Sequence, residues 1–131
     1  MHKVVLSIAS NRFQKANLLK ARQRLGEMLV DVKYTSELWT EPSGSCRRDL
    51  YLNQLACGST TLTEQQLNEQ LKQVESDFGR DEVARRLGIV PIDLDILMFN
   101  NQRRHLADWD RHYVKSLLNE CEWTATAQQE K

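Results

Sequence analysis

Two aspartates separated by one residue, Asp93 and Asp95, stand in the most apolar run of the chain, residues 92–99. Side chains alternate along a strand, so both carboxylates are predicted on one face. Neighbouring carboxylates on a mostly buried strand repel each other and lose hydration, so at least one should be protonated unless a cation lies beside them. Mg²⁺ meets that need, because it accepts two carboxylates and completes its shell with water and phosphate oxygens. The opposite face is predicted to carry Ile92, Leu94, Ile96 and Met98.

Three arginines precede this strand. Arg80, Arg85 and Arg86 fall in a predicted irregular stretch, residues 80–91, that leads into the aspartates. Guanidinium groups match phosphate oxygens and stabilise the charge that spreads during phosphoryl transfer. Taken alone, the aspartate pair fits a solvated strand end as well as a metal site, and the arginines fit a solvated loop. Their combination favours chemistry on a nucleoside triphosphate.

Other residues could bind a flat ring or a nucleotide. Tyr51 and Asn53 share one face of another predicted strand, where an aromatic plate beside a carboxamide suits a heterocycle. Glu75 falls in the last turn of a predicted helix, where the helix dipole disfavours a carboxylate, and it could bond a nucleotide hydroxyl or base. An ordinary core tyrosine and a solvated glutamate are the alternatives.

The hydrophobic pattern changes period several times and predicts the elements that carry these residues. Strands are predicted at 4–9, at 30–34 with a broken continuation toward 40, at 50–57 and at 92–99. Helices are predicted at 13–28, 67–78 and 114–121. This order is typical of an α+β ferredoxin-like sandwich, with a mainly antiparallel sheet and helices packed on one face. A single domain over 1–123 and a polar tail at 124–131 account for the length.

Local signals predict how the helices begin. Ser10 or Asn11 can cap the first helix, Thr63 and Gln66 form a capping box before the second, and Asp108 can cap the last. The longest irregular stretch, residues 41–49, is rich in turn-forming residues. A loop of this size inside a compact domain is more often functional than idle.

Charge and composition narrow the class of partner. Eighteen basic side chains balance eighteen acidic ones, so the formal net charge is zero. Proteins that bind nucleic acid or membrane surfaces usually carry a basic excess, so neither partner is expected. No apolar run reaches bilayer length and no signal-peptide features stand at the start, so a cytoplasmic location is expected. Cys46, Cys57 and Cys121 are odd in number and far apart, which favours reduced thiols over a disulfide or zinc site.

Residues 87–99, Leu-Gly-Ile-Val-Pro-Ile-Asp-Leu-Asp-Ile-Leu-Met-Phe, resemble the signature of the 6-hydroxymethyl-7,8-dihydropterin pyrophosphokinase family of folate biosynthesis. Four further pieces fall in the same order. They are Ile-Ala-Ser-Asn at 8–11, Thr-Glu-Pro at 40–42, Tyr-Leu-Asn at 51–53, and Glu75 followed by Gly79-Arg80. The strand order predicted above also agrees with the ferredoxin-like core of that family.

The resemblance implies transfer of the β,γ-pyrophosphoryl group of ATP to the hydroxymethyl oxygen of a reduced pterin, with release of AMP. It implies two Mg²⁺ ions held by Asp93 and Asp95, with ATP and the pterin as partners and no obligate protein partner. Loops 41–49 and 80–91 would close over both substrates and exclude water. The implied roles are catalytic for Asp93, Asp95, Arg80 and Arg85, ATP-binding for Glu75, Ile96, Arg86 and Arg111, and pterin-binding for Thr40, Pro42, Tyr51 and Asn53.

Four positions depart from the family pattern. Ala9 stands where the family favours glycine, Leu87 replaces an aromatic residue, and Ile89-Val90 replaces a small residue and an arginine just before the acidic strand. A valine cannot neutralise phosphate charge, although Arg85 or Arg86 can reach in from nearby. These departures keep open a second hypothesis, a catalytically weakened descendant that binds a pterin, a nucleotide or a protein.

The region beyond the acidic strand leaves two further alternatives open. His105 and His112 are both candidates for the family's histidine, while Arg111 and Tyr113 match an arginine and an aromatic residue near the final helix. A ferredoxin-like RNA-binding module is the third functional hypothesis. The zero net charge and the lack of paired exposed strand aromatics count against it.

Overall fold

The computed structural model describes residues 1–42 and 49–121. Residues 43–48, which include Cys46 and most of the predicted loop 41–49, lie outside the described residues, as does the predicted tail 124–131. The strands are β1 (His2–Ser10), β2 (Val30–Tyr34), β3 (Leu38–Thr40), β4 (Tyr51–Thr60), β5 (Asp93–Phe99) and β6 (Gln102–Arg103). The helices are α1 (Gln14–Met28), α2 (Glu64–Asp77), α3 (Glu82–Leu87), the 3₁₀ helix η1 (Leu106–Asp110) and α4 (His112–Leu118). Within these residues, none of the helices has the length and hydropathy that crossing a bilayer needs.

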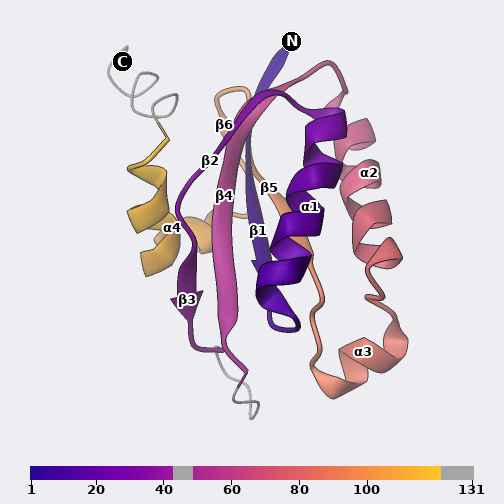
Figure 1. The fold of residues 1–131 in the computed structure, drawn as a ribbon. Coiled ribbons are helices and arrows are strands. Elements are labelled where there is room, and N and C mark those ends of the chain that lie inside the picture. The colour runs from indigo at the N-terminus through magenta and orange to yellow at the C-terminus, as the bar shows by residue number, and fades with distance from the viewer. Residues whose placement is uncertain (43–48, 122–131) are drawn as a thin grey trace.

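One antiparallel sheet forms the middle layer (Figure 1). Its strands run in the order β2-β4-β1-β5-β6, and the short β3 also pairs with β4. The pairs formed by β1 with β4 and β5, by β4 with β2 and β3, and by β5 with β6 are all antiparallel. This topology, with β1 central, confirms the predicted α+β ferredoxin-like sandwich.

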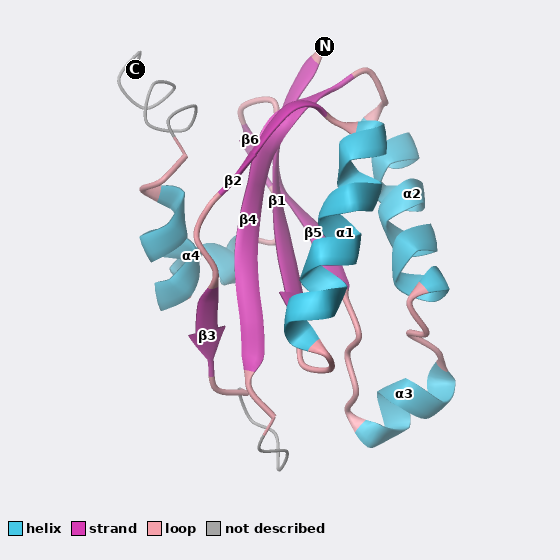
Figure 2. Ribbon diagram, in the orientation of Figure 1, coloured by secondary structure: helices cyan, strands magenta, loops and turns pink. Residues whose placement is uncertain are grey.

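Helices α1 and α2 cover one face of the sheet, called here the front face (Figure 2). The alternation predicted for the strands decides which side chains lie there, because every second residue points forward. The front core contains Val4, Leu6 and Ile8 of β1, Leu52 and Ala56 of β4, Leu18 and Leu25 of α1, and Leu67 and Leu71 of α2. Burying each of the larger side chains stabilises the fold by about 1.5–3 kcal/mol.

A second, smaller core lies on the opposite, rear face, under η1 and α4. It joins Val5 of β1 and Leu55 of β4 to Trp109, Val114 and Leu117. The Trp109 indole N–H donates to the backbone carbonyl of Leu97 at 3.2 Å, which fixes η1 against β5. The expectation of helices on one face therefore describes α1 and α2, and α4 adds a partial third layer behind the sheet (Figure 1).

Strand β5 changes register halfway along its length. It pairs with β1 in one register up to Ile96 and in another from Met98, so Leu97 is an extra residue of the kind that forms a β-bulge. Met98 consequently packs in the rear core with Leu97. The prediction that Met98 shares a face with Ile96 is wrong, because strict alternation fails at a bulge. Asp93 and Asp95 precede the shift and share the rear face.

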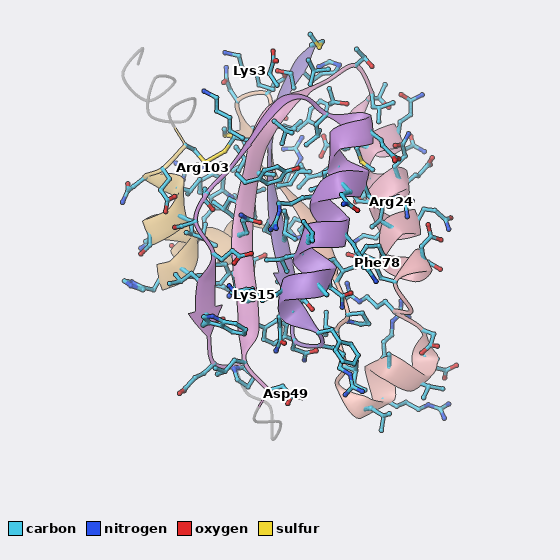
Figure 3. All side chains as sticks on the ribbon, viewed as in Figure 1. Lys3, Lys15, Arg24, Asp49, Phe78 and Arg103 are labelled. Atoms are coloured by element: carbon cyan, nitrogen blue, oxygen red, sulfur yellow. A yellow bond between two sulfur atoms is a disulfide. The ribbon has the colours of Figure 1, made fainter. Side chains whose placement is uncertain are left out.

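Cys57 of β4 forms a disulfide with Cys121, which follows α4; their Cα atoms lie 6.6 Å apart (Figure 3). The prediction of reduced thiols is wrong for this pair. Sequence spacing could not reveal the pairing, since the two residues are 64 positions apart and meet only because α4 folds back behind the sheet. The bond ties the end of α4 to the central part of the sheet.

Two helix starts differ from prediction. Ser10 and Asn11 do not cap α1; the residue before α1 is Phe13, in the left-handed conformation with φ 45° and no side-chain cap. Asp108 does not cap the last helix, because it lies inside η1 and pairs with Arg111 at 3.2 Å. Polar residues near a helix start are common, so the pattern alone did not distinguish the capping residue.

The predicted capping box of α2 is confirmed: Thr63 Oγ1 accepts from the backbone N–H of Gln66, and the Gln66 side chain accepts from the backbone N–H of Thr63. The stretch 80–91, predicted to be irregular, contains α3. Asp81 caps this helix by accepting from the backbone N–H of Ala84 at 2.8 Å, and Gly88 ends it at φ 69°. Gly88 can adopt that left-handed conformation without the strain that a Cβ would add.

Candidate active site

A row of three residues crosses the rear face of the sheet where β4, β1 and β5 lie side by side. In the strand register, Asn53 of β4 stands opposite Ala9 of β1, and Ala9 stands opposite Asp93 of β5. All three line one cavity of about 870 Å³. The small side chain of Ala9 therefore leaves space between a carboxamide and a carboxylate.

The cavity collects most of the predicted substrate-binding residues. Its walls include Thr40 of β3, Pro42 just after it, Tyr51 and Asn53 of β4, Asp93 of β5, and Arg111 just before α4. Helix α4 closes the far side with His112 and Tyr113. Burial raises the pKa of the Tyr113 phenol above its ordinary value, so the ring stays neutral and hydrogen-bonding at physiological pH.

Asn53 is fixed at the floor of this cavity. Its side chain is 2% exposed, and its amide nitrogen donates to the Leu38 carbonyl at 2.9 Å and to Thr40 Oγ1 at 2.8 Å. These bonds orient the carboxamide and leave its oxygen as an acceptor that no described donor reaches. A buried acceptor of this kind suits a ring N–H or amino group of a ligand.

Arg80 links the acidic strand to helix α2. Its guanidinium lies 2.7 Å from Asp93 Oδ1 and 3.1 Å from Glu75 Oε2. Burial alone would lower the pKa of Arg80, but the hydrogen bond to Asp93 and the nearby carboxylate charges raise it above its ordinary value. Arg80 therefore carries a permanent positive charge beside Asp93 and Glu75.

Asp95 lies deeper than Asp93. Burial, followed by the charge of Asp93, raises the pKa of Asp95 to about 6, although Lys72 and His105 oppose the shift. The Lys72 ammonium lies 3.6 Å from Asp95 Oδ1, and His105 Nε2 lies 3.8 Å from the same oxygen. The sequence predicted this effect, because two neighbouring carboxylates that share a partly buried site repel each other.

Glu75 occupies a structural position beside this pair. It is 6% exposed, and its Oε2 accepts from the backbone N–H of Leu94 at 2.8 Å and lies 3.3 Å from the Lys72 ammonium. The pairing of β5 with β6 covers only Met98 and Phe99, so the Leu94 backbone lies at a sheet edge. Side chains of α2 thus cover the open part of this edge, and the Arg80 and Lys72 charges offset the unfavourable end of the helix dipole.

Ile96 lines a second cavity of about 550 Å³ between α2 and the segment after β6. His105 also lines it, together with an ion pair in which Arg104 donates to both carboxylate oxygens of Glu64, at 2.7 and 3.0 Å. The two candidate histidines are therefore separated: His105 lies beside Asp95, whereas His112 lines the larger cavity.

The structure does not bring Arg85 and Arg86 to the aspartates. Both are exposed on α3 and neither belongs to the cavity lining. Arg86 pairs with Glu82 one helical turn away at 2.8 Å, the ordinary arrangement on an exposed helix. Val90, in contrast, lines the cavity and contributes no charge there.

Sequence reasoning missed two residues of the site. Lys72 stands three positions before Glu75, a spacing that places both on one face of α2, and this signal was available in the sequence. Asn11 was read as a helix cap, yet its side chain accepts from the backbone N–H of Val90 at 2.6 Å and donates to the Gly88 carbonyl at 2.9 Å. No local pattern signals a contact across that distance in sequence.

Comparison with known proteins identifies the family of this chain. The family model 7,8-dihydro-6-hydroxymethylpterin-pyrophosphokinase matches residues 5–122. A folate synthesis bifunctional protein of Arabidopsis thaliana is 31% identical over 125 residues, which cover 88% of this chain and 26% of that protein. A mitochondrial folate synthesis bifunctional protein of the same plant is 30% identical over 128 residues, covering 89% of this chain and 23% of that protein.

A folate synthesis bifunctional protein of Chlamydia trachomatis serovar D is 36% identical over 52 residues, covering 40% of this chain and 11% of that protein. The chain thus spans about a quarter or less of the length of the curated relatives it matches. Because the family model covers nearly the whole chain, this protein belongs to the 7,8-dihydro-6-hydroxymethylpterin-pyrophosphokinase family.

Proposed function

We propose that this chain transfers the β,γ-pyrophosphoryl group of ATP to the hydroxymethyl group of a reduced pterin and releases AMP. The observation that carries the proposal is the row Asn53–Ala9–Asp93 in one cavity. The Asn53 carboxamide, which suits a heterocycle, and the Asp93 carboxylate, which suits metal-bound phosphate, therefore lie in one cavity. A transfer between two bound substrates requires that proximity.

The pterin would bind at the end of the row formed by Asn53. The carboxamide nitrogen is held by Leu38 and Thr40, and Asn53 lines the same cavity as Tyr51 and Tyr113. A pterin carries both a flat ring and N–H donors, so it can use the aromatic walls and the amide oxygen together. This arrangement supports a pterin better than an aliphatic substrate.

The residues present fit Mg²⁺ at Asp93 and Asp95. Burial and the charge of Asp93 raise the pKa of Asp95 to about 6, and a bound dication would oppose both effects by favouring the ionised carboxylate. Among the described residues, no three side chains of His, Cys, Asp or Glu cluster as a metal site. Two carboxylates suffice when phosphate oxygens and water supply the other ligands, and bound Mg²⁺ would then neutralise triphosphate charge.

In the proposed reaction, the hydroxymethyl oxygen forms a bond to the β-phosphorus of ATP. The bond from that phosphorus to the α,β-bridging oxygen breaks, AMP leaves with the electron pair, and the hydroxyl proton passes to water. No side chain needs to form a covalent bond. The protein would act by aligning the two substrates and by neutralising charge, for which Arg80 is placed 2.7 Å from Asp93.

Val90 favours a second candidate function, binding without turnover. Its side chain lines the cavity without charge where the family pattern has an arginine, and the exposed Arg85 and Arg86 do not reach the lining, so among the described residues Arg111 is left as its arginine. A family member with too little positive charge at the transferred group would still bind both substrates.

One assay separates the two functions. The protein is incubated with ATP, Mg²⁺ and reduced hydroxymethylpterin, and AMP is measured against ADP by chromatography. We expect AMP from the wild type, and at least a hundredfold less from Asp95→Asn, while Asp31→Asn, an exposed carboxylate of β2, leaves the rate unchanged. Calorimetric binding of both substrates without AMP would support the second candidate, and equal turnover by Asp95→Asn would contradict the first.

A further inference from the structure

The Lys72 ammonium lies among three oxygen atoms at the edge of β5. It is 3.3 Å from Glu75 Oε2, 3.4 Å from the Leu94 carbonyl oxygen and 3.6 Å from Asp95 Oδ1. These are the kinds of oxygen that a cation uses, and a carboxylate of the proposed metal pair is one of them. Lys72 thus offsets part of the charge that Mg²⁺ would neutralise.

The two ends of this contact differ in exposure. Glu75 and Asp95 are held in the fold with side chains 7% and 17% exposed, whereas the Lys72 side chain is 48% exposed. A long side chain with one open side can leave an ion pair at small cost, since partly exposed pairs are weak. The lysine therefore has an open side toward water that its two carboxylate partners lack.

A metal ion at Asp95 and an ammonium at the same oxygen repel each other. Metal binding without nucleotide must therefore displace Lys72 into water. When ATP arrives with the metal, its phosphates bring negative charge to the displaced ammonium, so the displacement costs less. Two ligands that each reduce the cost of binding the other are positively coupled.

We propose that Lys72 is a positioning residue, an exchangeable counter-cation of Asp95 that weakens the binding of free metal and makes metal and nucleotide bind together. This inference rests on the proposed function, because it assumes the metal pair and ATP. The role acts through Asp95 and requires no contact with the pterin.

The test measures Mn²⁺ binding to the protein without nucleotide at pH 8, where Asp95 is ionised, by electron paramagnetic resonance or calorimetry. Lys72→Met should bind Mn²⁺ about five- to tenfold more tightly than the wild type, because a competing charge is gone. At saturating Mn²⁺, the same variant should bind α,β-methylene-ATP several-fold more weakly. A lysine that only ties α2 to β5 would not produce these opposite shifts.

Lys72→Arg should behave as the wild type, and Lys20→Met, which removes an exposed charge from α1, serves as the matched control. Lys72→Gln provides a second variant if the methionine reduces folding yield. Equal or weaker Mn²⁺ binding by the Lys72→Met and Lys72→Gln proteins would overturn this inference alone. Failure of every protein, including the wild type with the analogue, to bind Mn²⁺ would overturn the proposed function as well.

Discussion

Asn11 and Val90 are joined by two hydrogen bonds across the end of the sheet. The backbone N–H of Val90 donates to Asn11 Oδ1 at 2.6 Å, and the backbone N–H of Asn11 donates to the Val90 carbonyl at 2.9 Å. The Asn11 amide also donates to the Gly88 carbonyl. The segment after α3 is therefore fastened to the end of β1 at the rim of the larger cavity.

Replacement of Asn11 by alanine should release this segment. Asn11 is buried, so the loss of its two side-chain hydrogen bonds should lower the free energy of unfolding by about 2–3 kcal/mol. Urea denaturation measures the loss, and amide hydrogen exchange at Val90 should accelerate in the native protein. Asn17→Ala, which removes a more exposed bond to the Arg12 carbonyl, should cost less than half as much. Unchanged exchange at Val90 would show that the bonds do not hold the segment.

Asn53→Leu should separate ring recognition from phosphate binding. The substitution keeps the branching of the side chain but removes the acceptor at the cavity floor and the bonds to Leu38 and Thr40. A buried site that loses a matched hydrogen bond should bind the pterin about a hundredfold more weakly, and ATP binding should change little.

Calorimetry with each ligand measures both effects. Thr40→Val is the informative control, because it removes only the hydroxyl that accepts from Asn53 and should weaken pterin binding less. Equal loss of pterin and ATP binding in Asn53→Leu would indicate collapse of the cavity.

The stability of the metal-free protein should depend on pH through Asp95. Burial and the Asp93 charge raise its pKa to about 6 in the folded state, against about 3.9 in the unfolded chain. The protonated form thus favours folding, and this contribution is lost as the pH rises from about 4 through about 6. The melting temperature of Asp95→Asn, which cannot ionise, should therefore exceed that of the wild type by more at pH 7 than at pH 4.

Thermal unfolding in the presence of a chelator checks this, and excess Mg²⁺ should reduce the difference at pH 7. Asp77→Asn gives a control of opposite sign, because the bonds from Gln73 and Arg24 lower the pKa of that carboxyl. A difference between Asp95→Asn and the wild type that does not vary with pH would contradict the electrostatic account.

Reduction should destabilise the protein through the Cys57–Cys121 bond. A cross-link between residues 64 positions apart restricts the unfolded chain, and its loss should cost about 2–4 kcal/mol. Unfolding with and without a phosphine reductant measures this. Cys57→Ser should abolish the effect of the reductant and Cys46→Ser should preserve it. Thiol titration of the denatured chain should find one reactive group before reduction and three afterwards.

Local signals predicted the fold where the residues that decide a structure are neighbours in sequence. Thr63 and Gln66 marked the start of α2 because both partners of the capping box lie within one turn. Alternation placed Asp93 and Asp95 on one face because nothing interrupts β5 before Leu97. The extra residue at Leu97 is a property of the pairing with β1, which a single strand's pattern does not show.

The sequence indicated which charged residues belong to the site, but it did not indicate which residues they contact. The acidic pair and Arg80 were found, since their types and spacing carry the chemistry. Arg85 and Arg86 were expected near them because they are close in the chain, but α3 carries them on its exposed surface. His105 reaches Asp95 because the β5–β6 hairpin turns the chain back along β5.

The bulge at Leu97 divides β5 into a segment that carries the aspartates and a segment that packs in the rear core. The residues before it place Asp93 and Asp95 on the rear face, where Asp93 lines the larger cavity, and the residues after it pack with Trp109 in the rear core. Side-chain orientation in one half is no longer dictated by the other, so changes in the hairpin at Asn100 can be absorbed without rotating the carboxylates. The strand works as two independently adjustable segments, which would let the outer hairpin vary among relatives while the chemistry stays in place.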